Sequence, residues 1–205
     1  MPAPAGIIHS LTFAAIDFES AGAARGATDT PVQIGMALWS PQHGFTATYV
    51  SYLEARQPIT WAAQKTHGIR PADLTDAPAL ISLWPEVKNF LDGRVIVAHG
   101  KGTEKKFLRA FPGHGFGPWV DTLLLARAAW PEQGGHSLGH LCRELALTEK
   151  ISALVPDRSW HDALFDAVAS LCLLEWMIAN LELGDLPLAC LLQPDQSRWH
   201  LRKNP

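Results

Sequence analysis

Cysteine is scarce in this chain of 205 residues, and the few cysteines form no metal-binding pattern. Cys142, Cys172 and Cys190 are odd in number and lie far apart, with no Cys-x-x-Cys pair. This spacing argues against a disulfide framework and against a cysteine-based zinc site. It predicts reduced thiols in the core of a cytoplasmic protein. The nine histidines form no His-Glu-x-x-His motif. A zinc hydrolase is therefore an unfavoured alternative.

Positive charge is not in excess either. The chain has 17 Lys and Arg against 20 Asp and Glu, for a formal net charge of -3. This balance argues against a generally basic surface that binds nucleic acid non-specifically. The objection loses force if bound metal consumes several of the acids, because the metal then reverses the local sign of charge.

The sequence also lacks a segment typical of export or membrane crossing. Residues 1–6 have no basic region, and Asp17 interrupts the apolar run that follows. The apolar stretch 163–183 contains three acids, which predicts a buried or amphipathic helix. We find no repeat and no low-complexity segment. We therefore expect one cytoplasmic domain over residues 1–184 with no membrane partner, followed by a tail over residues 185–205 that is weakly held unless Trp199 docks.

The apolar pattern predicts an α/β fold. Strands are expected at 11–16, 32–39, 45–53, 94–98 and 119–121. Helices are expected at 61–67, 79–91, 102–111, 122–130, 137–147 and 159–183, with Thr60 as an N-cap and Gly68 as a left-handed C-cap. Strands joined by short links come first, and strands alternating with helices follow. This order predicts a mixed sheet, three antiparallel strands and then two parallel ones, with helices on its faces.

Two acids lie at the end of the first predicted strand. Side chains at positions i and i+2 of a strand lie on the same face, so Asp17 and Glu19 point towards the same region while Phe18 points to the opposite face. Two neighbouring carboxylates repel each other, and each resists ionisation. A divalent cation would offset the repulsion, and oxygen ligands suit Mg²⁺ or Mn²⁺. The alternative is a pair of ordinary surface acids at a strand end.

Two further acids follow the later strands and helices. Glu104 begins the helix after strand 94–98, at the edge of the sheet where ligands gather in such folds. Its alternative role is to interact with the helix dipole. Asp166 lies among apolar residues of the last helix, where an unpartnered carboxylate would be costly. Both acids could therefore join the first pair around a cation.

The start of the last helix has two features of its own. Ser159 and Asp162 match a capping box, which predicts that the helix begins there. His161 lies five positions before Asp166, roughly 140° round an ideal helix. Both side chains can face one site only if His161 belongs to the entry turn or the preceding loop.

Five short motifs occur in a characteristic order. They are Asp-x-Glu-Ser-x-Gly at 17–22, Pro-Val-Gln-Ile-Gly at 31–35, His-Gly-Ile at 67–69, Val-Ala-His at 97–99 and His-x4-Asp at 161–166. Together they resemble the DEDDh exonucleases, which include the proofreading subunit of the bacterial replicative polymerase, RNase T and oligoribonuclease. The resemblance covers about residues 11–180. It implies an RNase H-like fold, 3′→5′ exonuclease activity and two Mg²⁺ or Mn²⁺ ions.

The resemblance also implies roles for individual residues. Asp17, Glu19 and Asp166 match the metal ligands of the group, and His161 matches its general base. The second motif departs from the group, because Glu104 stands where the group usually has Asp. We predict that Glu104 is the fourth catalytic acid and a metal ligand. Asp121 is the reserve candidate, although it matches a structural aspartate of the group.

The predicted substrate contacts lie in three stretches. The residues are Phe18, Ser20, Ala21, Gly22, His67, Lys101 and Lys105. Ser20, Ala21 and Gly22 match the stretch that holds the 3′-terminal nucleotide in the group. His67 falls where the group lines the same pocket, although it could equally be a hydrogen-bonded histidine at a helix end. Lys101 and Lys105 belong to a basic cluster with Lys106 and Arg109. This cluster is either a solvated helix face or a track for phosphates.

The function that these patterns predict is removal of nucleoside 5′-monophosphates from single-stranded or frayed 3′ ends of DNA or RNA. A nuclease-like module that binds nucleic acid or protein with weak or no catalysis is the alternative, and the altered second motif motivates it. No oligomeric state is predicted.

Overall fold

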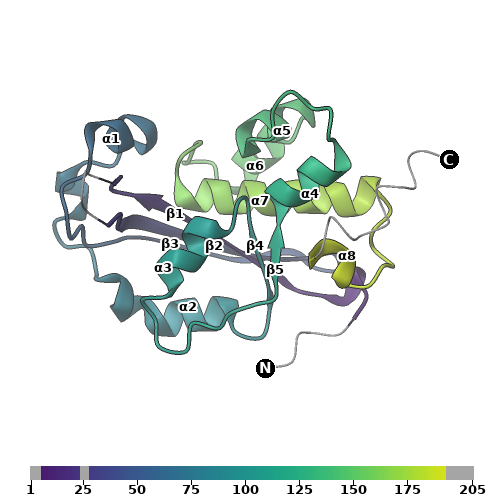
Figure 1. Ribbon diagram of the computed structural model, residues 1–205, viewed down its shortest axis with the longest axis horizontal. Helices are drawn as coiled ribbons and strands as arrows, with labels where there is room; N and C mark the ends of the chain where they lie inside the picture. Colours follow the sequence, from purple (N-terminus) through teal and green to yellow (C-terminus); the bar gives the residue numbers. More distant parts are fainter. Residues whose placement is uncertain (1–5, 24–27, 193–205) are drawn as a thin grey trace.

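The computed structural model describes residues 6–23 and 28–192 and contains a five-stranded sheet (Figure 1). The strands are β1 (Phe13–Ser20), β2 (Pro31–Ser40), β3 (Gly44–Tyr52), β4 (Val95–Ala98) and β5 (Trp119–Asp121). Their order across the sheet is β3-β2-β1-β4-β5. Strands β1, β2 and β3 pair antiparallel, whereas β4 is parallel to β1 and β5 is parallel to β4. The predicted mixed sheet is confirmed.

Helices cover both faces of this sheet (Figure 1). On one face lie α2 (Trp84–Leu91) and α3 (Gly102–Leu108); on the other lie α4 (Thr122–Ala129), α5 (Leu138–Glu144), α6 (Thr148–Leu154) and α7 (Ala163–Asn180). Helix α1 (Trp61–His67) lies near the end of β1, and α8 (Ala189–Leu192) packs beside β5. Short 3-10 turns occur at Ile8–Ser10, Pro71–Leu74 and Leu80–Leu83. The domain therefore has three layers, with the sheet in the middle.

The alternation of side chains along β1 decides where its acids point. Phe13 and Ala15 belong to the apolar core under α7, whereas Phe18 belongs to the core on the side of α2 and α3. Asp17 and Glu19 continue the odd-numbered series. They therefore lie on the α7 face of the sheet, and Phe18 lies on the opposite face, as the sequence predicts.

Gly35 of β2 allows α7 to begin in direct contact with the sheet. Gly35 lies opposite Asp17 in the β1–β2 register. A Cβ atom at position 35 would lie 2.2 Å from the carbonyl carbon of Ala163 and 2.2 Å from the nitrogen of Leu164. No side chain separates the strand from the first turn of the helix. This close approach brings Asp166, one turn into α7, towards the acids of β1.

The start of α7 corrects one prediction from the sequence. The helix begins at Ala163, and its N-cap is Asp162, whose Oδ1 accepts hydrogen bonds from the nitrogens of Leu164 and Phe165. The capping box predicted from Ser159 is wrong. The reason is the main chain at His161, whose φ of 67° turns the chain before the helix begins.

Other helix boundaries also differ from the predicted ones. The helix expected over 137–147 ends at Glu144, and Ala146 adopts a φ of 54° before α6, which was not predicted. The helix expected over 79–91 is a 3-10 turn followed by α2, and the one expected over 102–111 ends at Leu108. The caps of α1 are confirmed, because Thr60 accepts from the nitrogen of Ala63 and Gly68 has a φ of 73°.

The last helix of the main fold is the most apolar element. By length and composition α7 could cross a membrane, but 72% of its apolar 18-residue window is buried inside the domain. Its apolar sequence is explained by contact with the sheet on one side and with α5 and α6 on the other. This burial is typical of the central helix of a globular domain.

The chain beyond the predicted domain boundary at residue 184 begins by packing on the domain. Leu188 and Leu191 are buried, and Ile7 forms an isolated β-bridge with Pro187. Residues 193–205, including Trp199, lie outside the described residues. The division into a domain and a tail therefore stays a prediction.

We expect the substitution Gly35→Ala to destabilise the protein by about 1–3 kcal/mol or more, because the added methyl group would overlap the main chain of α7. Urea unfolding measures this change. Gly134→Ala is the matched control, since a Cβ there meets no atom within 4 Å. Equal stability of the two variants would contradict the close packing of α7 on β2.

Candidate active site

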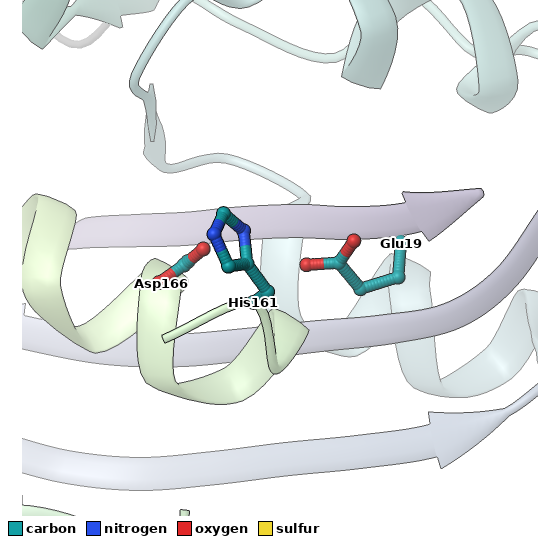
Figure 2. Close-up of side chains that lie close together, drawn as sticks. All are labelled: Glu19, His161 and Asp166. Atoms are coloured by element: carbon teal, nitrogen blue, oxygen red, sulfur yellow. The ribbon is translucent and has the colours of Figure 1, made fainter. Parts of the chain in front are cut away.

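Five predicted catalytic residues reach the same end of the sheet from three elements and one loop. Asp17 and Glu19 come from β1, Glu104 from α3 and Asp166 from α7, while His161 lies in the loop before α7. One ligand atom each of Glu19, His161 and Asp166 lie within 4.8 Å of one another. Figure 2 shows the imidazole of His161 beside the carboxylates of Asp166 and Glu19. Residues that are far apart in the sequence therefore form one compact group.

Asp17 lies at the electrostatic centre of this group. Burial raises its pKa well above the ordinary value, and the negative charges of Asp166, Glu104 and Glu19 raise it further. Asp17 thus interacts with acids from all three elements, although it is outside the set of ligand atoms within 4.8 Å. An ionised carboxylate at this position needs a cation nearby.

The pKa values of the other three acids are raised as well. Burial, with the charges of Asp166 and Asp162, raises the pKa of Glu19 to about 8. Burial raises the pKa of Asp166 to about 7, opposed by a hydrogen bond from the main-chain N–H of His161. Burial also raises the pKa of Glu104 to about 7. Four acids with this behaviour need a positive partner to be ionised together.

Unpartnered oxygen atoms show that the group fits a divalent metal. Within the described part of the chain, Oε2 of Glu104 and Oδ1 of Asp166 are buried and accept no hydrogen bond. An ionised carboxylate in such a position is costly unless a cation binds it. The donors are oxygen atoms, with one imidazole nearby, which suits a hard cation such as Mg²⁺ or Mn²⁺.

Asp121, the reserve candidate, has a different role. Its Oδ1 accepts hydrogen bonds from the nitrogens of Gly100 and Leu123, and its Oδ2 accepts one from the nitrogen of Lys101. Asp121 is the N-cap of α4 and ties the loop after β4 to that helix. Its oxygens are therefore occupied by main-chain donors, whereas Glu104 keeps one oxygen unpartnered.

His161 is held in an unusual conformation. Its φ of 67° is uncommon for a residue other than glycine, and such strain often marks functional positions. The side chain of His161 is exposed. His161 thus precedes the helix, which satisfies the condition that the sequence sets for His161 and Asp166 to face one site.

Residues 20–22, which follow Glu19, are held close to the start of α1 by main-chain contacts. The oxygen of Ala21 accepts from the nitrogen of Thr60 at 2.8 Å, and Gly22 has a φ of 81°. A Cβ at Gly22 would lie 2.4 Å from Oγ1 of Thr60, so this close contact requires glycine. The side chain of Ala21 is buried. Any substrate contact from this stretch must come mainly from its main chain and from Ser20.

His67 connects α1 to the end of β1. Its Nδ1 accepts from the nitrogen of Ile69 at 3.0 Å, so its Nε2 donates to the oxygen of Ser20 at 3.1 Å. Burial lowers the pKa of His67, which favours this neutral form. Both ring nitrogens are in use, which supports the alternative of a hydrogen-bonded histidine at a helix end. Its predicted role in the substrate pocket stays a prediction.

Phe18 and the basic cluster lie on the other side of the sheet. The ring of Phe18 is buried against Phe107, with the ring centroids 5.4 Å apart, so only its main chain could contact a substrate. Lys101 is half-buried, and Lys105 is exposed with its Nζ 5.6 Å from the ring centroid of Trp119. The predicted cluster, completed by Lys106 and Arg109, lies on the same helix as Glu104 or next to its ends.

The contact between Gln33 and the start of α7 was not predicted from the sequence. Gln33 is 2% exposed, and its side chain bonds to Asp162 and to the main chain of Ala163. The available signal was an amide inside the otherwise apolar run 32–39. Such a buried amide requires partners, but the sequence does not say which ones.

The fold and the site together define the class of this protein. A mixed sheet in the order β3-β2-β1-β4-β5, with four acids gathered at the carboxyl end of β1, is that of an RNase H-like nuclease domain. More particularly, the chain belongs to the exonuclease family, because the RNase T exonuclease family model matches residues 14–174. The resemblance to DEDDh exonucleases is confirmed.

Known proteins similar to this chain agree with that assignment. A DNA polymerase III subunit epsilon-like protein of Rhodobacter capsulatus is 30% identical over 168 residues, which are 80% of this chain and 23% of that protein. A PolC-type DNA polymerase III of Bacillus cereus is 27% identical over 64% of this chain and 9% of its own length. The chain thus spans less than a quarter of either relative.

Solved structures share the fold at low sequence identity. Exonuclease X, in complex with 5′ overhanging duplex DNA, matches with a TM-score of 0.64 and 22% identity over 84% of this chain and 97% of that chain. The nuclease domain of 3′hExo, a DEDDh family member bound to rAMP, matches with a TM-score of 0.67 and 14% identity over 82% and 92%.

We expect the metal-free protein to lose stability as the pH rises from about 5 to 8. The folded-state pKa values of Glu19, Glu104 and Asp166 lie above their ordinary values of 4.5, 4.5 and 3.8, so the folded protein binds more protons in this window. Their contribution is present below the ordinary values and is lost as the pH rises through about 7–8.

Added Mn²⁺ should reverse this loss at pH 8, raising Tm by roughly 5–10 °C at a hundredfold excess over Kd. At pH 5 the effect should be much smaller, because protonated carboxyls bind metal poorly. Thermal unfolding with EDTA or Mn²⁺ at both pH values measures this. A Tm that is independent of Mn²⁺ at pH 8 would contradict a metal site.

Proposed function

We propose that this domain is a 3′→5′ exonuclease that hydrolyses DNA or RNA from the 3′ end and releases nucleoside 5′-monophosphates. The observation that carries the proposal is the grouping of Glu19, His161 and Asp166 beside Asp17 and Glu104 in an exonuclease-family fold. Buried acids with unpartnered oxygens have no structural use at this place. A phosphodiester substrate and divalent cations would give them one.

The proposed site holds two Mg²⁺ or Mn²⁺ ions. Asp17, Glu19 and Asp166 would hold one ion, and Asp17 and Glu104 would hold the other. Bound ions would supply charge neutralisation for the phosphate and the leaving 3′-oxygen and would favour ionisation of the attacking water. The side chain of Glu104 is one methylene longer than Asp, so its unpartnered oxygen can reach further towards Asp17.

His161 is proposed to take the proton from the attacking water. An imidazole suits this general-base role at neutral pH, and its exposed position allows the proton to pass on to solvent. One ligand atom of His161 lies within 4.8 Å of those of Glu19 and Asp166, so the base is next to the proposed metal ligands. The main chain of residues 20–22 would bind the 3′-terminal nucleotide, with Phe18 contributing only through its main chain.

The nucleic acid partner is proposed to be a single-stranded or frayed 3′ end. Lys101 and Lys105 would contact its phosphates, since they lie on the helix that carries Glu104 or at its start. Exonuclease X is bound to DNA and 3′hExo to rAMP in their structures, so both kinds of nucleic acid are candidate substrates. The preference between them depends on contacts to the 2′-hydroxyl.

The activity is tested with 5′-labelled single- and double-stranded DNA and RNA in the presence of Mn²⁺. We expect a ladder of products that shorten one nucleotide at a time from the 3′ end, together with release of nucleoside 5′-monophosphates. The double variant Asp17→Asn/Glu19→Gln serves as the inactive control. Binding of an oligonucleotide without shortening of any substrate would instead favour the alternative of a nuclease-like binding module.

His161→Asn separates the general base from the metal site. Asparagine tolerates a positive φ, so the loop should keep its shape while the base is lost. We expect kcat to fall by about 10²–10⁴-fold, with little change in Mn²⁺ affinity. His43→Asn, an exposed substitution in the β2–β3 turn, is the matched control. Wild-type turnover in the His161 variant would remove this residue from the mechanism.

A further inference from the structure

Gln33 makes a buried connection between β2 and the first turn of α7. Its Oε1 accepts a hydrogen bond from the nitrogen of Ala163 at 3.0 Å, and its Nε2 donates to Oδ2 of Asp162 at 2.8 Å. Both ends of the amide are thus used at one helix start. The residue is 2% exposed, so neither bond has water as a ready replacement.

Asp162 extends this connection into the helix. Its Oδ1 accepts from the nitrogens of Leu164 and Phe165, which caps α7, while its Oδ2 accepts from Gln33 and from the guanidinium of Arg158. Three main-chain N–H groups at the start of α7 are therefore satisfied through this pair of side chains. Gln33 and Asp162 together determine where the first turn of the helix lies.

The register of the sheet places this connection next to the acids. Gln33 lies opposite Glu19, and Gly35 lies opposite Asp17. Because directly opposed residues share a face, the surface of β2 that holds α7 adjoins the surface of β1 that carries the two carboxylates. Asp166 follows Asp162 by one turn, and its nitrogen bonds to the oxygen of Asp162. Any shift of Asp162 is thereby passed to Asp166.

We propose that Gln33 is a positioning residue, which fixes the first turn of α7 on β2 and so sets the separation of Asp166 from Asp17 and Glu19. The inference rests on the proposed metal site. Gln33 makes this connection opposite Glu19 without adding a charge beside the acids. The amide of Gln33 combines the acceptor that the nitrogen of Ala163 needs with the donor that Asp162 needs.

A swap of hydrogen-bond direction tests this role. Gln33→Glu keeps an acceptor for Ala163 but sets a carboxylate against Asp162. Asp162→Asn keeps the cap through its carbonyl oxygen but turns an amide N–H₂ towards that of Gln33. In the double variant the introduced carboxylate accepts from both the introduced amide and Ala163, and the net charge equals that of the wild type.

The readout is Mn²⁺ affinity, measured by titration calorimetry with the metal alone at pH 7.5. We expect each single variant to bind Mn²⁺ about 10–100-fold more weakly, as is typical when a supporting hydrogen bond behind a ligand is lost. The double variant should return to within about threefold of the wild type. With an oligonucleotide substrate, kcat should follow the same pattern while KM changes little.

Controls separate positioning from general destabilisation. Ser170→Ala removes another buried polar group of α7, more than one turn from the acids, and should lower stability without weakening Mn²⁺ binding. If Gln33→Glu does not fold, Gln33→Met should show the same loss of affinity with no rescue by Asp162→Asn.

Two results would overturn the inference. Single variants that bind Mn²⁺ as tightly as the wild type, or a double variant no better than the singles, would show that Gln33 does not position Asp166. These results leave the proposed function untouched, because the wild type still binds the metal. A wild type that binds no Mn²⁺ would instead end the proposed metal site, and the role of Gln33 with it.

Discussion

Contact between the first turn of α7 and the bare main chain of β2 at Gly35 is the constraint on which the site depends. Because Gly35 has no side chain, the first turn of α7 packs directly on the main chain of β2, and this short distance lets Asp166 approach the carboxylates of β1. Burial and the negative charge of Asp166 oppose this approach, because both raise the pKa values of Asp17 and Glu19. The apolar remainder of α7, buried in the core, supplies the stabilisation that keeps the helix in place.

The position of the site at the end of the sheet allows both helical layers to contribute. Asp17, Glu19 and Asp166 belong to the α7 side, whereas Glu104 begins a helix whose Phe107 packs in the opposite core. A residue in the middle of the sheet could not meet side chains from the far layer, because the strands would separate them. At the carboxyl ends of β1 and β4 this barrier ends, and Glu104 comes within electrostatic range of Asp17.

Family membership and chemistry rest on different observations. The match to the exonuclease family and the TM-scores of 0.64 and 0.67 establish the fold, which can serve many functions. The chemistry depends on particular side chains. Glu104, at the position where DEDDh exonucleases usually have Asp, keeps one carboxylate oxygen without a hydrogen-bond partner. Both oxygens of Asp121 instead accept hydrogen bonds from main-chain nitrogens. Of these two acids, Asp121 therefore has a structural role, whereas Glu104 keeps an oxygen available for the proposed metal.

The sequence by itself determined the features that follow from local geometry. The two-residue period of a strand places Asp17 and Glu19 on one face. The cap at Thr60 follows from its hydroxyl group and the cap at Gly68 from the absence of a Cβ atom, while the order of apolar runs gives the mixed sheet. Only the tertiary structure decided the start of α7 and the use of Gln33. The turn at His161 and the partners of Gln33 depend on contacts between segments about 130 residues apart, and no local pattern contains that information.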